Sequence, residues 1–565
     1  MESKGAIMDV VTNLLNGQGN KDVVTIALTA VGGLLVGGFI SYKALDMWAK
    51  AEYERLLNNP KTECDIDAHV GAPKQNPVSA LKVVVAQKAQ LGGRQASLEA
   101  IPLECFPSPY ISGLNVTRRE GGEAPSAAGG KPVDPKDVQK LQDFLKSASD
   151  SGKKPIVVAT IRMGFGHHRL AYSTVSWALG QGYPTIFHDL LNISSDEADL
   201  LASTDDLYSK LSRLSSEMGG IIETMLGTLL LQGDADALRV ANLTAAHLQP
   251  LLLAYPKDIP IITTHQVVAL AAVAAGFKNV VNLVVDNYPQ WFLTVPKTKN
   301  MMQGPVNYQS FLRMGIKHQE VVYAGHWCPK EMVDNIDVDC QRRIARAKKG
   351  FGDNGGKVQP RRVLIPVGGA GAQKTYISNF LRNVADLVTG GKLQLFLNAG
   401  DHKHMKASFT EVLAELKLDY DIVDSMDDLT KFQENLLASE TNEPKKAITL
   451  FAYEEYIPAV VTTDILCRVS DVLACKPSEM AFYCVPKLML RRVGEHEAFS
   501  AKRASELGDG TVEAREVSDA REFLDLFLAS PDVLVQMNDC IMKNNQIGIY
   551  SGCKVAVETV VQMAS

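Results

Sequence analysis

The sequence lacks a surplus of positive charge. Its 565 residues include 58 Lys and Arg against 64 Asp and Glu, which gives a formal net charge of −6. Binding to nucleic acid depends on clustered cations that replace the counterions of the phosphate backbone. We therefore expect no nucleic-acid partner.

Paired cysteines are also missing. The nine cysteines are scattered, and no C-x-x-C pair occurs. This spacing indicates neither a disulfide framework nor a zinc site, and it fits a reducing compartment. Residues 337–339 (DVD) and 401–404 (DHKH) are weak metal-binding candidates, because the first lies in a charged helical stretch and the second contains a lysine. No bound metal or cofactor is expected.

Long apolar runs are absent except near the N-terminus. Residues 23–42 (VVTIALTAVGGLLVGGFISY) contain no charged side chain. Twenty helical residues span about 30 Å, the thickness of the hydrocarbon layer of a bilayer. The acidic residues before this run and the lack of an A-x-A site argue against a cleaved signal peptide. We expect a transmembrane helix within an N-terminal segment of residues 1–50, with a buried core helix as the alternative.

The rest of the chain divides at two polar, glycine-rich stretches. Residues 51–150 have an irregular pattern and are expected to form a linker. From residue 154, short β-branched runs alternate with helical ones, which is typical of a parallel sheet with crossover helices. The pattern breaks at 350–362 and then resumes. We predict an α/β fold of two Rossmann-like lobes, residues 151–349 and 363–565, with strands at 156–160, 185–188, 261–264, 280–285, 363–367, 393–398, 447–451 and 487–490.

The first candidate motif is residues 160–169 (TIRMGFGHHR), between an expected strand and an expected helix. Arg169 occupies the third glycine position of G-x-G-x-x-G, so a dinucleotide-dependent dehydrogenase is disfavoured. His167 and His168 can provide a near-neutral base at the mouth of a cleft. The alternative is that a histidine here caps the helix or packs.

The second candidate motif is residues 366–374 (PVGGAGAQK). A glycine loop before a helix offers free backbone N–H groups to a phosphate. The spacing is not that of a P-loop, so ordinary NTPase chemistry is not expected. A tight turn is the alternative. The candidate residues are Gly368, Gly369, Gly371 and Lys374.

The third candidate motif follows an expected strand near residue 475. A carboxylate after a turn suits the diol of a ribose, and a His-Glu pair can bind sugar hydroxyls. The alternative for each of these charged residues, taken singly, is that it lies on a solvated loop and binds no ligand. The candidate residues are Lys476, Ser478, Glu479, His496 and Glu497.

Together these motifs resemble the GT-B nucleotide-sugar glycosyltransferases, in the group of monogalactosyldiacylglycerol synthase, processive diacylglycerol glucosyltransferase and the lipid-I GlcNAc transferase. Residues 164–167 (GFGH) are similar to the G-G-G-H loop of that group. Residues 284–292 (VVDNYPQWF) resemble its V-T-D…W-F stretch, and 322–329 (VYAGHWCP) resemble the segment that ends its acceptor lobe. The resemblance covers residues 154–555.

The donor lobe carries the rest of the resemblance. Residues 368–371 are similar to the glycine loop beneath the diphosphate, and 470–472 (SDV) resemble the run before the donor motif. Glu479 matches the ribose-binding glutamate, although the loop before it is about five residues shorter than the family's K-x-G-P-G-T-x-x-E. His496 and Glu497 match the sugar-contacting pair.

The resemblance implies inverting transfer of a sugar from a UDP-sugar, as substrate, to an acceptor hydroxyl without a metal. It implies His167 as the base, then His168, then Asp286. Backbone N–H groups of the glycine loop, with Lys374 or Lys476, would stabilise the departing diphosphate.

A membrane anchor in such an enzyme implies a lipid or membrane-held acceptor. The lobes are expected on the cytosolic side, where UDP-sugars are made. The basic run within residues 342–349 is expected either to contact anionic head groups or to form a solvated helix. Two alternatives to a transferase remain: a catalytically inactive GT-B-fold scaffold, which the short donor loop favours, and a nucleotide-sugar epimerase.

Overall fold

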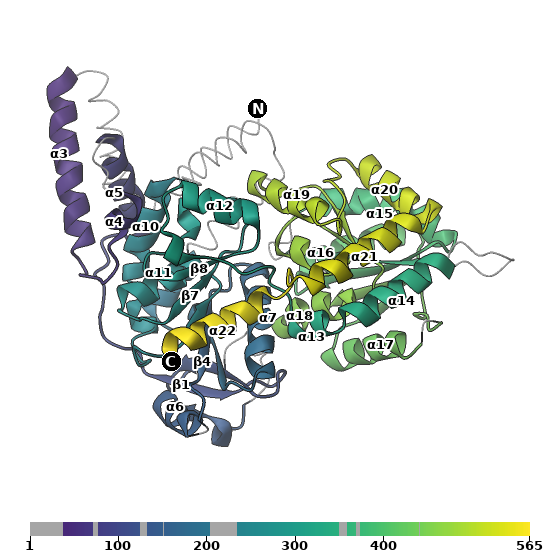
Figure 1. Ribbon diagram of the computed structural model, residues 1–565, viewed down its shortest axis with the longest axis horizontal. Helices are drawn as coiled ribbons and strands as arrows, with labels where there is room; N and C mark the ends of the chain where they lie inside the picture. The colour runs from purple at the N-terminus through teal and green to yellow at the C-terminus, as the bar shows by residue number, and fades with distance from the viewer. Residues whose placement is uncertain are drawn as a thin grey trace.

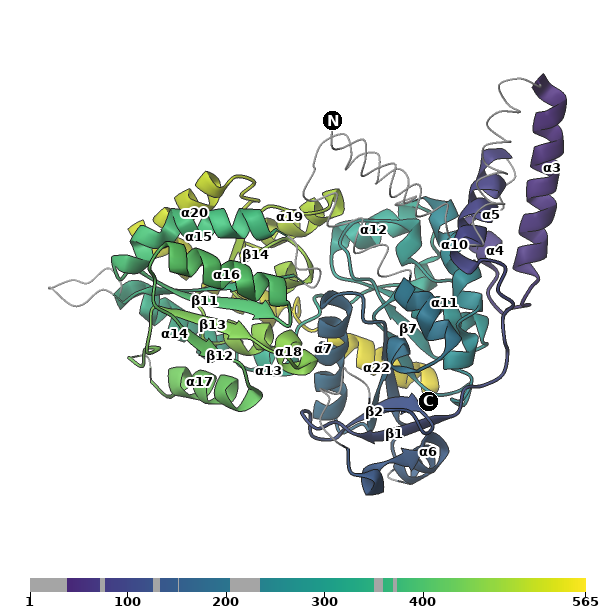
Figure 2. The ribbon, with the colours of Figure 1, turned by 180° about the vertical axis from the view of Figure 1, so that it is seen from behind.

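The structure is a computed structural model. Two α/β lobes lie side by side, and a pair of helices projects from the N-terminal lobe (Figures 1 and 2). The structure describes residues 38–71, 77–124, 133–150, 152–203, 234–349, 359–368, 373–439 and 441–565.

The expected transmembrane helix at residues 23–42 lies outside the described residues, except for its last five positions. Those positions open helix α3 (Gly38–Leu57). Within the described ranges, no helix is both long enough and apolar enough to cross a membrane. Helices α3 and α5 (Pro77–Leu91) pack against α10 (Ala235–Ala246) through a small apolar cluster that includes Tyr53, Val84 and Leu243.

The N-terminal lobe is built on a sheet that, in the described residues, has nine strands in the order β3-β1-β2-β5-β4-β6-β7-β8-β9. Neighbouring strands from β2 to β9 are parallel, whereas β1 is antiparallel to β2 and β3. The strands are β1 (Leu103–Pro107), β2 (Leu114–Arg119), β3 (Gln139–Lys140), β4 (Ile156–Thr160), β5 (Thr185–Asp189), β6 (Ile261–Thr263), β7 (Val280–Leu283), β8 (Lys299–Met302) and β9 (Val321–Tyr323).

Helices cover both faces of this sheet (Figures 1 and 2). Every residue of β4, β5, β6 and β7 is buried, as expected for parallel strands with covered faces. The helices of this part of the chain that have not been named are α4 (Ile66–Val70), α6 (Leu141–Ser149), α7 (Gly166–Gly180), α11 (Gln266–Ala274), α12 (Pro305–Arg313), α13 (Lys330–Asp334) and α14 (Ile336–Lys349).

The C-terminal lobe has an all-parallel sheet in the order β12-β13-β11-β10-β14-β15. The two sheets confirm the expected α/β fold of two Rossmann-like lobes in a GT-B-like arrangement. The elements are β10 (Arg361–Pro366), α15 (Lys374–Thr389), β11 (Leu393–Gly400), α16 (Lys403–Glu415), β12 (Asp421–Val423), α17 (Met426–Ala438), β13 (Ile448–Ala452), α18 (Tyr456–Cys467), β14 (Val472–Cys475), β15 (Lys487–Met489), α19 (Ala498–Glu506), α20 (Val517–Ala529), α21 (Asp532–Gln546) and α22 (Gly552–Ala564).

Residues 51–150 differ from the expected irregular linker, because they supply β1, β2 and β3 to the first sheet. Strand β1 reads LECFP, and its apolar pattern is interrupted by a charged residue and ended by a proline. Glu104 is nevertheless buried, since Arg118 on β2 donates to it at 2.6 Å. Because charged residues of β1 and β2 are buried as an ion pair, these short strands do not show the alternation of apolar and polar residues that would predict a strand.

The chain passes from one lobe to the other at residues 325–328 and again at 548–552. These two segments are hydrogen-bonded to each other. His326 N donates to Ile549 O at 2.6 Å, and Gly552 N donates to His326 O at 3.0 Å. Gly325 has a φ of 98°, and a Cβ there would lie 2.5 Å from Ile549 O. Beyond the second crossing, α22 packs on α7, β6 and β7 of the N-terminal lobe, while α14 packs on α21 of the C-terminal lobe.

In the basic run on α14, the central arginines Arg343 and Arg346 are buried, so they form neither the expected contact with head groups nor a solvated face, whereas Lys348 and Lys349 are exposed. Arg343 is buried and donates to Ser470 O at 2.9 Å and to Cys467 O at 2.8 Å. Arg346 is buried with its Nε 3.1 Å from Asp471 Oδ1. These contacts attach α14 to the loop before β14, because buried guanidinium groups require acceptors on every side.

His188 on β5 is a buried histidine held in a neutral state. Its Nδ1 lies 2.8 Å from Thr117 Oγ1 and 3.2 Å from the hydroxyl of Tyr255. Burial lowers the pKa of His188 to about 4, and the neighbouring Asp189 offsets this only in part. The unfolded chain therefore binds a proton near pH 6 that the folded chain does not.

We predict that His188 makes the protein less stable as the pH falls. Between pH 7 and pH 5 this group should cost about 2 kcal/mol of unfolding free energy, because only the unfolded state is protonated there. Urea unfolding of the native chain and of His188→Gln at both pH values tests this. The variant should lose less stability on acidification, and an equal loss in both proteins would contradict the prediction.

Candidate functional site between the lobes

The loop from β4 to α7 is the point where the N-terminal lobe contacts the carboxyl edge of the C-terminal sheet. Gly164 has a φ of 70°, a conformation that favours glycine, and Gly166 begins the helix. Between them, the ring of Phe165 lies 5.2 Å from that of His402 and 5.8 Å from that of Tyr456. A Cβ on Gly400 would lie 2.9 Å from this ring, so the missing side chain makes room for Phe165.

Two arginines of the same region cross to the other lobe. Arg162 Nη2 lies 3.2 Å from Asp401 Oδ2, and its guanidinium lies 3.7 Å from the centre of the Tyr456 ring. Arg169 is fully buried, with Nη1 2.5 Å from Glu479 Oε1. Opposite charges therefore join the first candidate motif to the third.

His167 is half-buried and held by its Nδ1, which lies 2.6 Å from the carbonyl oxygen of Thr264. That contact makes Nδ1 the protonated nitrogen and leaves the lone pair on Nε2, for which the described residues supply no hydrogen-bond partner. Burial lowers the pKa of His167, and the Thr264 carbonyl and the Asp286 carboxylate offset this only in part. The imidazole is therefore neutral at pH 7 with one nitrogen able to accept a proton.

His168 points into the N-terminal lobe. It is fully buried, with Nε2 3.1 Å from Asp189 Oδ2. Asp189 Oδ1 accepts hydrogen bonds from Arg162 N at 3.2 Å and from Leu191 N at 3.1 Å. The His168–Asp189 pair thus supports the loop from within. Asp286, the third candidate base, is half-buried, and its carboxylate is near enough to raise the pKa of His167.

In the C-terminal lobe, three candidates meet at the carboxyl ends of β10 and β14. Lys476 Nζ pairs with Glu497, and a Cβ on Gly368 would lie 2.9 Å from Lys476 Cε. Glu497 Oε2 also accepts from Val493 N at 2.7 Å. Lys476 is therefore held over the start of the glycine loop by a carboxylate that is itself fixed by the backbone.

The remaining donor-lobe candidates are more dispersed. Gly369 and Gly371 lie outside the described residues. Lys374 is exposed at the first residue of α15, and His496 is half-buried in a 3-10 helix (Glu495–Glu497). Ser478 is the N-cap residue of another short 3-10 helix, which begins at Glu479.

Glu479 carries a negative charge inside the interface. Burial raises the pKa of its carboxyl, but Arg169 and Lys476 together lower it by more, so the net shift is downward. Close by, the Tyr483 hydroxyl donates to Asp464 at 2.6 Å. Burial raises the pKa of Asp464 to about 6. Two carboxyl groups with pKa values shifted in opposite directions thus share this interface, a feature common at functional sites.

Several of these residues could not be identified as site residues from their sequence context. Arg169 stood out only because it breaks a glycine fingerprint, and its partner lies 310 residues further along the chain. Phe165 and Arg162 look like ordinary loop residues until the second lobe is placed against them. The local sequence pattern predicts that these residues lie in a loop between a strand and a helix. It does not predict which residues of the other lobe that loop contacts.

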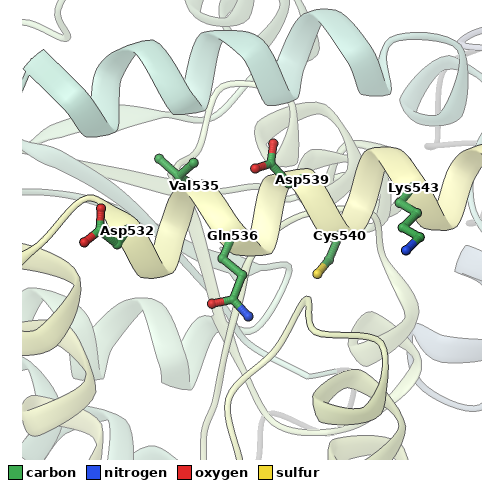
Figure 3. Close-up of a pocket in the computed structure, with 6 residues that line it drawn as sticks. All are labelled: Asp532, Val535, Gln536, Asp539, Cys540 and Lys543. Atoms are coloured by element: carbon green, nitrogen blue, oxygen red, sulfur yellow. The ribbon is translucent and has the colours of Figure 1, made fainter.

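Two hollows lie near or beyond these groups. One, of about 780 Å³, borders the loop after β5 and includes Arg162, Asn192 and Ser195 in its lining. The other, of about 310 Å³, is a shallow depression lined only by side chains of α21, including Asp539 and Cys540, and contains no candidate site residue (Figure 3). In the described parts of the chain, no three His, Cys, Asp or Glu side chains are grouped to hold a metal ion.

Comparison with known protein families finds two adjacent matches. Residues 130–313 match a domain of unknown function, DUF6937. Residues 316–561 match a second domain of unknown function, DUF6938. The boundary between the two matches falls just before the first crossing between the lobes. No curated protein sequence matches the chain.

Several solved structures are similar at low identity. The UDP-GlcNAc 2-epimerase from Neisseria meningitidis bound to UDP-GlcNAc is 12% identical, with a TM-score of 0.38 over 72% of this chain and 100% of that one. Glycosyltransferase VinC in complex with DTDP is 11% identical, with a TM-score of 0.33 over 73% and 99%. The trehalose-6-phosphate synthase OtsA is 13% identical, with a TM-score of 0.35 over 71% and 98%. Similarity at this level assigns no activity.

Proposed function

We propose that the protein is an inverting glycosyltransferase of the monogalactosyldiacylglycerol synthase group, which moves a sugar from a UDP-sugar to an acceptor hydroxyl. The observation that supports this best is the geometry of His167. A neutral imidazole fixed through Nδ1, with the lone pair on Nε2 and the charge of the Asp286 carboxylate acting on the ring, is what a general base for a hydroxyl requires. It lies where the carboxyl edges of two Rossmann-like sheets face each other, the usual ligand edge of such sheets.

In the proposed reaction, His167 Nε2 takes the proton of the acceptor hydroxyl as its oxygen bonds to the anomeric carbon. The bond from that carbon to the diphosphate breaks, and its electron pair goes to the diphosphate oxygen. Lys476 and the backbone N–H groups after β10 would stabilise the charge that develops there. Asp286 would stabilise the imidazolium that forms.

We predict saturable binding of UDP to the full chain, with Glu479 accepting hydrogen bonds from the ribose. Isothermal titration should show this binding, and Glu479→Ala should weaken it at least tenfold, because the hydroxyls lose a charged acceptor. Glu104→Ala is the matched control, since Glu104 is equally buried and paired but lies in the other lobe. Equal affinity in Arg169→Gln and in Arg169→Gln/Glu479→Ala, where the ion pair is broken in both, would remove Glu479 from the donor site.

We predict that His167→Asn lowers the transfer rate by a factor of about 10² to 10⁴ and leaves UDP affinity nearly unchanged. Asparagine can still donate to the Thr264 carbonyl, but it cannot accept the acceptor's proton. In the native chain the rate should hold at pH 6.5, where an ordinary histidine is half protonated, and fall only at lower pH, because burial lowers the pKa of His167. A variant that retains the native rate and pH profile would exclude His167 as the base.

We further propose that residues 23–42 anchor the protein in a membrane, that its acceptor is a lipid or membrane-held molecule, and that the lobes lie on the cytosolic side. The described helix that follows this segment supports the proposal. In α3, Met47 is 72% exposed and Trp48 is 37% exposed. Tryptophan is enriched at the boundary between lipid and water.

We predict that the full chain floats with lipid vesicles in a density gradient. The double substitution Leu34→Arg/Leu35→Arg should abolish this, because each arginine costs about 3 kcal/mol at the centre of a membrane helix. Leu14→Arg/Leu15→Arg, outside the apolar run, should float like the native chain. A native chain that stays at the bottom of the gradient would exclude the anchor.

A non-catalytic binding protein is the second candidate, and the pairing of Arg169 with Glu479 favours it. In that case the carboxylate matched to ribose binding serves only to join the lobes. The titration separates the two candidates when it is repeated with Arg169→Gln, in which this ion pair is broken, since a folded chain that binds UDP in neither form fits the scaffold alone.

A further inference from the structure

Glu479 is bound by the opposite lobe at one carboxylate oxygen and lies close to Gly166 of that lobe at the other. Its Oε1 lies 2.5 Å from Arg169 Nη1. A single carbon added to Gly166 would lie 3.3 Å from its Oε2. The Glu479 side chain is only 10% exposed and that of Arg169 is not exposed at all. Arg169 therefore occupies Oε1, and the burial of both side chains leaves little of the carboxylate open to a second donor.

The contact belongs to a set that joins the same two surfaces. Arg162 pairs with Asp401, Phe165 packs on Gly400, and the Tyr110 hydroxyl donates to Glu455. All of these groups come from loops of the N-terminal lobe and meet the carboxyl side of the C-terminal sheet. They would separate together if the lobes moved apart, whereas the paired crossings at 325–328 and 548–552 are part of the covalent connection.

We propose that the Arg169–Glu479 ion pair is a latch that closes the lobes over an empty nucleotide site. A nucleoside diphosphate reaches Glu479 only after Arg169 has left it, so the protein in this state inhibits its own donor binding. The identity of the ligand rests on the proposed function, but the latch itself does not. Arg169 is then the residue that sets how much of the protein is open at any moment.

The latch lowers affinity in a defined way. When only an open fraction of a protein can bind, the apparent dissociation constant is the intrinsic one divided by that fraction. Removing the cation should raise the open fraction, because Glu479 then gains more from water than from a closed interface without its partner. Weakening the ion pair should therefore tighten UDP binding. If Arg169 instead positioned Glu479 for the ribose, removing the Arg169 cation would weaken UDP binding.

The experiment compares the full native chain with Arg169→Gln and Arg169→Lys. Arg118→Gln is the matched control, because Arg118 forms a partly buried ion pair with Glu104 inside one lobe. Each protein is titrated with UDP. Amide hydrogen exchange is measured at residues 166–170 and 479–482, and the radius of gyration is measured by solution X-ray scattering.

We expect Arg169→Gln to bind UDP at least fivefold more tightly, to exchange faster at both segments and to have a larger radius of gyration. Arg169→Lys should fall between it and the native chain, and Arg118→Gln should match the native chain. Unchanged exchange and scattering in a folded Arg169→Gln would overturn the latch, and so would weaker UDP binding. If no protein binds UDP, the proposed donor site fails, while exchange and scattering still decide whether the latch exists.

Discussion

The arrangement of the two lobes depends on charge buried between them. Arg169 is enclosed completely, so its guanidinium must be matched by a carboxylate, and Glu479 supplies it from the opposite lobe. This one requirement brings the start of α7 against the carboxyl edge of the C-terminal sheet. With that edge in place, Phe165 meets Gly400 and Arg162 meets Asp401. His167, two residues before Arg169, is thereby placed beside the interface with its ring already oriented by Thr264.

At the start of α7, the adjacent histidines His167 and His168 have different surroundings and different roles. On a helix, neighbouring residues point about 100° apart, so one can face a cleft while the next faces the core. His168 turns inward to Asp189, whereas His167 is held by the carbonyl oxygen of Thr264. The inward histidine supports the loop through Asp189, which also accepts a hydrogen bond from Arg162 N of the same loop. A base and the support for its loop therefore come from consecutive positions in the sequence.

Much of the fold could be read from the sequence because its central strands are continuous apolar runs. The expected strands at 156–160, 185–188, 261–264 and 280–285 correspond to β4, β5, β6 and β7. Edge strands such as β1 and β12 were not detected, since they are short and carry charged residues. In the site, the loop positions of the candidates followed from the alternation of strands and helices. Their partners did not, because ion pairs between lobes leave no local pattern in the sequence.

The path of the last helix has a consequence for how the protein is made. Helix α22 covers α7, β6 and β7, yet it is the last of the described elements to be synthesised. Until it emerges from the ribosome, the apolar face that it covers in the N-terminal lobe remains open to solvent. Domains generally fold in the order of synthesis. Here part of the core of the first lobe is completed only after the second lobe has been synthesised, which leaves apolar surface of the nascent chain exposed to aggregation.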